Sequence, residues 1–198
     1  MERQLAIEFG KVQLFDDVLP PGLYEELVAA SRSLGWGFGW RAPGNPDALY
    51  WHHEVGFSQK ANVEDISSRV REHPVNAFAV FMDWLRSRLE PPGTRVLRYY
   101  LNAHTYGTDG WPHTDSDRAD DLTAILFLNP EWRGEWAGET VIFDNKGEIR
   151  LSVLPRANRL LIFPSNLVHA PRPLSRACSG LRVVLVVKMG APLASMQQ

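Results

Sequence analysis

The sequence has little cysteine, no long apolar run and no excess of charge of one sign. Cys178 is the single cysteine among 198 residues, which excludes an internal disulfide. No stretch approaches the ~18 consecutive apolar residues of a membrane-spanning helix, and the first ten residues lack the apolar run of a signal peptide. We therefore expect a cytoplasmic protein without a membrane partner, in which Cys178 is a free structural thiol.

The charges are nearly balanced. The chain has 21 Lys and Arg against 23 Asp and Glu, a formal net charge of -2. Such a chain has no global field that would attract the phosphate backbone, so we expect no nucleic-acid partner. Its 44% hydrophobic composition suits one well-filled core, which predicts a single domain over residues 1–198. The oligomeric state is left open by the sequence.

Helical patterns fill the first half of the chain. We predict a short strand near residues 12–15, a helix over 23–34 that Gly35 ends, and two helices between 63 and 89, with Pro74 in the first turn of the second. Residues 36–46 are rich in glycine and proline, which predicts a long irregular loop. These elements form a helical support over about residues 16–94.

The second half consists of short strand-like runs separated by turn residues. The runs cover residues 95–101, 111–114, 122–128, 140–143, 148–154, 159–163 and 181–188. Short strands broken by Asn-Pro, Pro-Ser and Asp-Asn-Lys-Gly clusters are typical of an antiparallel sandwich or barrel. We therefore expect a β-core over about residues 95–190.

One strand-like run carries a metal-binding pattern. His113 and Asp115 point to the same face if this run is extended, and His169 follows another run. Two histidines and one carboxylate suit non-haem Fe(II) with open coordination positions. His52-x-Glu54 has equally valid ligand chemistry, but it lies outside the strand-rich region, so we favour His113, Asp115 and His169.

Seven motifs follow one another in the β-core. They are residues 97–100 (LRYY), 113–115 (HTD), 122–132 (LTAILFLNPEW), 136–140 (WAGET), 159–163 (RLLIF), His169 and 180–182 (GLR). Their order and spacing resemble the catalytic core of prolyl-hydroxylase-type 2-oxoglutarate oxygenases, over about half of the chain. The resemblance implies a mainly β fold with supporting N-terminal helices around a double-stranded β-helix (jelly-roll or cupin-like) core. It also implies Fe(II), 2-oxoglutarate and O2 as cofactor and cosubstrates, with ascorbate in support.

The resemblance also implies how the cosubstrate is held. In the family a basic residue on a late core strand pairs with the distal carboxylate of 2-oxoglutarate, and Arg182 occupies that place. Arg176 competes for this role, but it lies in a loop-like stretch. Tyr100 is similar to the tyrosine that lines the cosubstrate pocket, whereas Phe127 falls where some relatives have a second tyrosine. Thr123 is then the candidate for the missing hydrogen bond.

The aromatic residues near the expected site are candidates for substrate binding. We assign Trp36, Trp40 and Trp111 to this role, and we expect residues 36–45, flanked by 169–179, to close over the substrate.

We therefore predict a dioxygenase that hydroxylates, or otherwise oxidises, an unactivated C–H bond of a small molecule such as an amino acid or natural-product intermediate. Prolyl hydroxylation of a peptide or protein is the alternative. A halogenase would need Gly or Ala in place of Asp115. A nucleic-acid demethylase, suggested by the spacing of Arg176 and Arg182, is disfavoured because no basic stripe is present. A non-catalytic ligand-binding β-barrel is disfavoured because metal and cosubstrate residues occur together.

Overall fold

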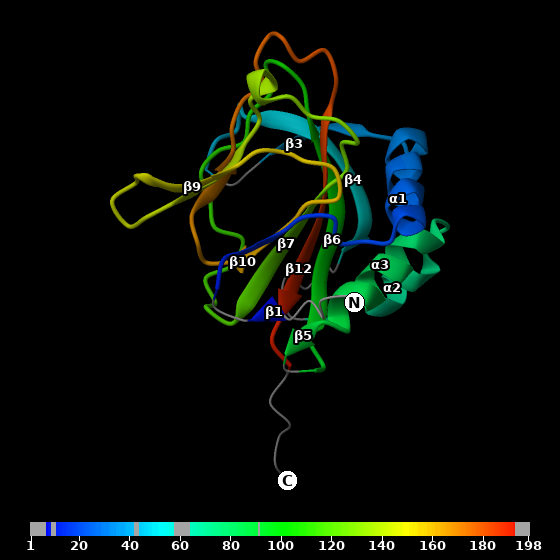
Figure 1. Cartoon of the computed structure of the whole chain (residues 1–198). Helices are drawn as coiled ribbons and strands as arrows, with labels where there is room; N and C mark the ends of the chain where they lie inside the picture. Colours follow the sequence, from blue (N-terminus) through cyan, green and yellow to red (C-terminus); the bar gives the residue numbers. More distant parts are fainter. Residues whose placement is uncertain (1–6, 9–10, 42–43, 58–63, 91, 193–198) are drawn as a thin grey trace.

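Two β-sheets face each other in the computed structural model, which describes residues 7–8, 11–41, 44–57, 64–90 and 92–192 (Figure 1). The larger sheet has the order β2 (Gln13–Phe15), β10 (Leu160–Pro164), β7 (Asp121–Phe127), β12 (Arg182–Gly190), β6 (Arg95–His104), β4 (Leu49–Phe57) and β3 (Gly37–Arg41). The smaller sheet has the order β11 (His169–Pro171), β8 (Thr140–Phe143) and β9 (Ile149–Val153). The expected mainly β fold with a double-stranded β-helix core is confirmed.

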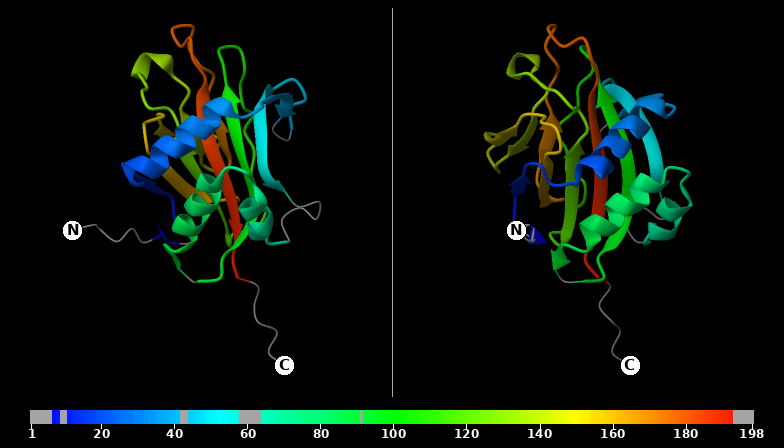
Figure 2. Two further views of the ribbon diagram at one scale, coloured as in Figure 1. Left: turned by 90° about the vertical axis from the view of Figure 1, so that its right-hand side faces the viewer. Right: turned by 45° about the vertical axis from the view of Figure 1, so that its right-hand side comes forward.

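The outer face of the larger sheet is covered by three helices, α1 (Pro21–Ser33), α2 (Ser67–Glu72) and α3 (Asn76–Arg86) (Figure 2). The buried side chains of α1 and α3 recur at helical spacing, as Phe78, Phe81, Met82 and Leu85 do in α3, which gives each of these two helices one apolar face. The helices fall where the sequence predicts them, although Pro74 precedes α3 instead of lying in its first turn. No helix in the described ranges is long and apolar enough to cross a bilayer.

Alternation along the central strands divides the core into two layers. Tyr99 and Leu101 of β6 face the helices, whereas Tyr100 of the same strand faces the smaller sheet. On β12, Leu185 faces the helices and Val186 faces the smaller sheet. Because both faces of β12 are buried, this strand is apolar between Arg182 and Lys188. β6 instead carries Arg98, Asn102 and His104 on its inner face, the one toward the smaller sheet, and a polar residue that is buried there needs a partner.

β3 and β4 differ from the sequence-based expectation. Residues 37–41 form a strand instead of an irregular loop, and together with β4 they extend the larger sheet beyond β6. A bulge at Gly39, whose φ of 112° suits glycine, shifts the register between Phe38 and Trp40. Phe38 therefore packs on Trp51, and Trp40 turns to the inner face opposite Tyr50. Residues 42 and 43 of the predicted loop lie outside the described residues.

β1 (Ile7–Glu8) and β5 (Leu89–Glu90) form a small parallel pair, and a 3-10 turn, η1 (Gly134–Trp136), precedes β8. The predicted helical support over about residues 16–94 therefore also contains strands. The amphipathic helices were readable from their spacing, whereas the glycines of β3 obscured its alternation.

Candidate metal centre

His113 and His169 are brought together by the backbone. The amide of each residue donates to the carbonyl of the other at 3.0 Å, which makes an isolated β-bridge at the mouth between the sheets. The predicted strand over residues 111–114 is therefore reduced to this one bridge. The Asp115 amide donates to the Ser165 carbonyl at 2.8 Å, which holds the next turn of the same segment.

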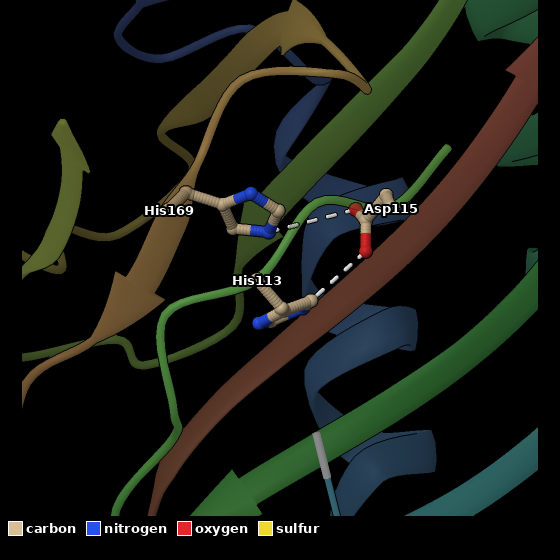
Figure 3. A group of neighbouring side chains, drawn as sticks. All are labelled: His113, Asp115 and His169. Atoms are coloured by element: carbon tan, nitrogen blue, oxygen red, sulfur yellow. Dashed lines mark ion pairs between the residues drawn. The ribbon is translucent and has the colours of Figure 1, made fainter. Parts of the chain in front are cut away.

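The side chains of His113, Asp115 and His169 converge on one point (Figure 3). Their potential ligand atoms all lie within 4.8 Å of one another. His113 Nε2 is 3.4 Å from Asp115 Oδ1, and His169 Nε2 is 3.5 Å from Asp115 Oδ2. Among the described residues this is the one group of three or more such side chains arranged to hold a metal ion.

The tautomers of both histidines suit metal binding. His113 Nδ1 lies 2.7 Å from the Trp111 carbonyl, and His169 Nδ1 lies 3.0 Å from the Leu167 carbonyl. Because a carbonyl oxygen only accepts, each Nδ1 carries the proton and donates it. The lone pair of each Nε2 then points toward Asp115, the arrangement in which an outer hydrogen bond orients a metal-bound imidazole. The residues present fit a divalent ion with open positions.

Asp115 is fixed by a chain of hydroxyl groups. The Thr123 hydroxyl donates to Asp115 Oδ2 at 2.7 Å, and Ser165 Oγ lies 2.9 Å from Thr123 Oγ1. Since the Thr123 proton goes to the carboxylate, Ser165 must be the donor to Thr123. Thr123 thus orients Asp115 and also lines the cavity, and its predicted contact with the cosubstrate stays a prediction. Register explains the contact with Ser165, because Thr123 pairs with Phe163 on β10, two residues before Ser165.

Lys188 is a buried cation that sequence reasoning missed. Its ammonium lies 2.6 Å from Asp115 Oδ1. Burial works against ionisation of Asp115, but the charge of the adjacent Lys188 outweighs it, so the pKa of Asp115 lies well below its usual range. A signal was present, because Lys188 follows Arg182 by six residues on one strand, which places both on the inner face.

Arg182 occupies the opposite end of the same face. Its guanidinium donates to the Gly138 carbonyl at 2.6 Å and to Thr140 Oγ1 at 2.7 Å, and it lies over the Phe127 ring. The side chain is 2% exposed, and burial lowers its pKa to about 10. Within the described ranges it forms no ion pair with a carboxylate. A buried guanidinium in this state is suited to an incoming anion.

His104 is a second polar group that the sequence analysis overlooked. It pairs in register with Arg182, is 2% exposed, and neither ring nitrogen has a hydrogen-bond partner among the described residues. Burial and the nearby Arg182 charge lower its pKa to about 3, so the ring is neutral. Tyr50 packs on it, with ring centroids 4.8 Å apart. Such an unpartnered group calls for a ligand.

These groups line one cavity of about 510 Å³, including the part open to solvent. Its walls include the three convergent residues, Arg182, His104 and the predicted Tyr100, with Val184 and Val186 between them. Asp115 is the one carboxylate among the described lining residues. The cavity therefore joins a metal-binding end to a cationic end across an apolar floor.

The predicted tryptophans fall in three different places. Trp36 packs against the helix-side cluster and donates to the Ser31 carbonyl at 3.2 Å, so we withdraw it as a substrate-binding residue. Trp40 is on the inner face, and its ring stacks on His52 at 4.0 Å. Trp111 is 46% exposed beside the bridge residue His113.

The competing residues lie elsewhere. Arg176 is exposed, donates to the Tyr106 hydroxyl at 2.9 Å, and does not line the cavity. His52 and Glu54 belong to β4, inside the larger sheet, so our reason for discounting them was wrong. His52 is nevertheless bonded to Asn102 at 2.8 Å and belongs to no metal-binding group in the described ranges. Cys178 is a buried free thiol.

Comparison with known proteins identifies the class. Residues 96–187 match the 2OG-Fe(II) oxygenase superfamily, a segment that begins in β6, ends in β12 and contains all three convergent residues. No curated protein matches the chain. The superfamily match identifies residues 96–187 as the core of a 2-oxoglutarate- and Fe(II)-dependent oxygenase, a class that uses Fe(II), 2-oxoglutarate and O2.

Solved structures show the same fold at low sequence identity. A prolyl-4-hydroxylase from Pseudomonas putida has a TM-score of 0.62 at 19% identity, over 92% of each chain. HygX from Streptomyces hygroscopicus, with nickel and 2-oxoglutarate bound, has a TM-score of 0.61 at 15% identity, over 92% of this chain and 83% of that chain. A Trichoplax adhaerens prolyl hydroxylase, solved with a hypoxia inducible factor peptide, has a TM-score of 0.59 at 14% identity over 90% and 83%.

Proposed function

We propose that this dioxygenase hydroxylates, or otherwise oxidises, an unactivated C–H bond of a small molecule such as an amino acid or natural-product intermediate. In this proposal His113, Asp115 and His169 hold Fe(II), and Arg182 binds the distal carboxylate of 2-oxoglutarate. Tyr100 lines the cosubstrate pocket, and His104 joins Thr123 as a candidate for the hydrogen bond to the cosubstrate. The observation that carries the proposal is a single cavity with three convergent ligands at one end and a buried, carboxylate-free arginine at the other.

Different residues around the cavity orient the metal ligands and exclude water. The hydrogen bonds from the two Nδ1 atoms keep both Nε2 lone pairs available, and the Ser165 to Thr123 chain fixes the Asp115 carboxylate. When bound, the iron centre with 2-oxoglutarate and O2 supplies the oxidation of a C–H bond. Apolar walls from Val184 and Val186 exclude water between the two ends. The chain thus contributes position and exclusion of water, and the bound group contributes the reactivity.

Prolyl hydroxylation of a peptide or protein is the second candidate. It is favoured by the likeness in fold to two prolyl hydroxylases, one of them solved with a peptide. The likeness to HygX, which was also solved with hygromycin B bound, favours a small molecule instead. Fold alone does not choose between these, because one fold hosts many substrates.

The test is a mass-shift screen of free amino acids, peptides and cell extract with Fe(II), 2-oxoglutarate and ascorbate, in which succinate release is followed. We expect a product whose mass rises by one oxygen atom and whose formation stops in His113→Ala, Asp115→Ala and His169→Ala. Circular dichroism should show that these variants keep their fold. Activity close to the parent at saturating iron in any of the three would remove that residue from the ligand set.

Anaerobic binding provides a test that needs no substrate. Addition of 2-oxoglutarate to the Fe(II)-loaded protein should produce a new visible absorbance, because the cosubstrate chelates the iron. Absence of both this absorbance and 2-oxoglutarate-dependent succinate would contradict catalysis and favour a ligand-binding barrel.

A further inference from the structure

The inner face of the larger sheet continues beyond the metal-binding end of the cavity. Register places Arg98 of β6 directly opposite Lys188 of β12, whereas His104 lies opposite Arg182 at the other end of the same two strands. Tyr100 lies between these ends and lines the cavity. Arg98 and Lys188 therefore flank the side of the metal centre that the cosubstrate anchor does not occupy.

Arg98 is held in an aromatic frame. Its guanidinium carbon lies 5.1 Å from the Tyr100 ring centre, 5.8 Å from that of Trp40 and 5.7 Å from that of Phe57. Stacking on rings fixes the plane of the guanidinium without using its N–H groups. The Nε atom is buried and has no hydrogen-bond partner among the described residues, while the side chain as a whole is partly exposed. The N–H groups of the Arg98 guanidinium, a fork of hydrogen-bond donors, are thus fixed in orientation, and the side chain reaches solvent.

The nearby acidic groups leave this fork unpaired. Asp115 is paired with Lys188, and Glu54, which faces the same side opposite Tyr100, is exposed and makes no ion pair with Arg98 in the part of the chain that the structure describes. In the loaded site the positive charges belong to Fe(II), Arg182, Lys188 and Arg98. Together they exceed the negative charges of Asp115 and 2-oxoglutarate. The loaded site therefore keeps an excess of positive charge on the Arg98 side.

A flat aromatic surface lies beside the fork. The Trp40 and His52 rings stack with an interplanar angle of 6°, and His52 is fixed by its hydrogen bond to Asn102. Tyr100 contacts both His52 and Arg98, with ring centroids 5.1 Å apart in the first case. An organic group that reaches the metal centre from this side meets apolar ring surface and a guanidinium together.

We infer that the substrate carries a carboxylate, that Arg98 binds this carboxylate, and that the ring surface of Trp40 packs against the adjoining organic group. The inference rests on the proposed function, whose substrate class it narrows to carboxylate-bearing small molecules. Arg98 would then act as a specificity-determining residue. Because a guanidinium binds a carboxylate in one bidentate orientation, Arg98 would fix the position of the substrate. The C–H bond that lies at the right distance from the carboxylate would then be next to the metal centre.

The test uses the protein loaded with Mn(II) and saturating 2-oxoglutarate without O2, so that Arg182 is already engaged and no turnover occurs. Isothermal titration compares phenylacetate with phenylacetamide, which have similar shape and differ in charge. We expect the parent to bind phenylacetate about tenfold more tightly than the amide, as a charge-assisted pair implies. Arg98→Gln should abolish this preference, and Arg98→Lys should retain part of it.

Two controls separate charge from packing. Arg176→Gln removes an exposed arginine outside the cavity and should leave the preference intact. Trp40→Ala should weaken both probes to a similar degree, because it removes ring surface and no charge, while Tyr100 and Phe57 still hold the Arg98 guanidinium. In the mass-shift screen, compounds that are oxidised should be acids whose primary amides are not.

Failure of the inference and failure of the proposed function give different results. If the parent binds no 2-oxoglutarate with Mn(II), the proposed function is wrong. If it binds 2-oxoglutarate but not phenylacetate, or if Arg98→Gln keeps the acid preference, the Arg98 assignment is overturned and the function stands. The Arg98 assignment would also be overturned if the substrate proved to be uncharged and the Arg98→Gln variant oxidised it as fast as the parent does.

Discussion

Arg182 and Arg176 are separated by six residues, yet they are in opposite environments. Arg182 is buried, is fixed by Gly138 and Thr140, and lines the cavity, whereas Arg176 is exposed and bonded to Tyr106. A buried guanidinium already positioned by two acceptors loses little freedom on binding a carboxylate. Arg176 is exposed to solvent and does not line the cavity, so nothing there would hold a carboxylate against it.

Arg182→Ala should therefore raise the dissociation constant for 2-oxoglutarate by about tenfold to a hundredfold, since loss of a charge-assisted contact costs about 1.5–3 kcal/mol. Arg176→Ala should leave this constant nearly unchanged. Titration of the anaerobic Fe(II) proteins with 2-oxoglutarate measures both. A large defect in the Arg176 variant alone would place the cosubstrate pocket elsewhere.

His104 should make the stability of the metal-free protein depend on pH. Its pKa is about 3 in the folded protein and 6.5 in its unperturbed state, so below pH 6.5 the unfolded chain binds a proton that the native chain does not. The contribution is present above pH 6.5 and is lost as the pH falls through that value toward 3. Between pH 7 and pH 5 the parent should lose about 2 kcal/mol relative to His104→Phe.

Urea unfolding of the two proteins at both pH values measures this difference. Tyr50→Phe is a matched control, because it alters a neighbour of the same ring without removing a group that titrates in this range. It should follow the parent in its pH dependence. If His104→Phe also follows the parent, the imidazole is protonated in the native state or reaches solvent.

At the scale of elements, the bulge in β3 decides where Trp40 points. The backbone at Gly39 has a φ of 112°, and a Cβ there would meet no atom within 4 Å, so strain and not a clash opposes a side chain. Gly37 has an ordinary backbone, and its Cβ would lie 3.7 Å from the His52 carbonyl oxygen. Substitution of each of these two glycines by alanine therefore gives a test variant and its control in the same strand.

Gly39→Ala should destabilise the protein by about 1–3 kcal/mol, the usual cost of a non-glycine residue in such a backbone region. Gly37→Ala should be neutral or slightly stabilising, because it restricts the unfolded chain without strain. Urea unfolding gives both values. Equal stabilities of the two variants would mean that the strand adopts a regular register and that Trp40 leaves the inner face.

Prediction from sequence succeeded where a pattern is local and failed where it depends on strand pairing. The helices follow from apolar spacing, and His113 and Asp115 follow from their two-residue separation in an extended segment. The orientation of Thr123 toward Asp115 depends on which residue of a neighbouring strand lies opposite, and alternation alone does not specify that register. His104 was missed for the same reason, since only its pairing with Arg182 marks it out.

At the scale of the whole molecule, the cavity is lined by residues of both sheets. Arg182 of β12 bonds to Gly138 and to Thr140 at the start of β8, and His169 belongs to β11, so the two ends of the cavity tie the larger sheet to the smaller one. Ligands that fill this space should therefore stabilise the entire fold.

Mn(II) and 2-oxoglutarate together should raise the free energy of unfolding by about 2.7 kcal/mol when 2-oxoglutarate is present at a hundredfold excess over its dissociation constant, in addition to the effect of the metal. Without metal, 2-oxoglutarate should stabilise much less. Thermal unfolding with each ligand alone and with both measures these effects. Arg182→Ala should respond to the metal but hardly to 2-oxoglutarate, and a full response in that variant would contradict the assigned anchor.

β12 carries both Arg182, the proposed cosubstrate anchor, and, six residues later, Lys188 beside Asp115. One regular strand thus acts as a ruler between the two ends of the cavity, with a scale fixed by the rise of ~3.3 Å per residue. In the proposed function, this spacing along β12 sets the length of oxo acid that fits, while Trp40, Arg98 and the loop after β11 border the other side. Changes in those bordering segments could redirect the enzyme to new substrates during evolution without altering its choice of oxo acid.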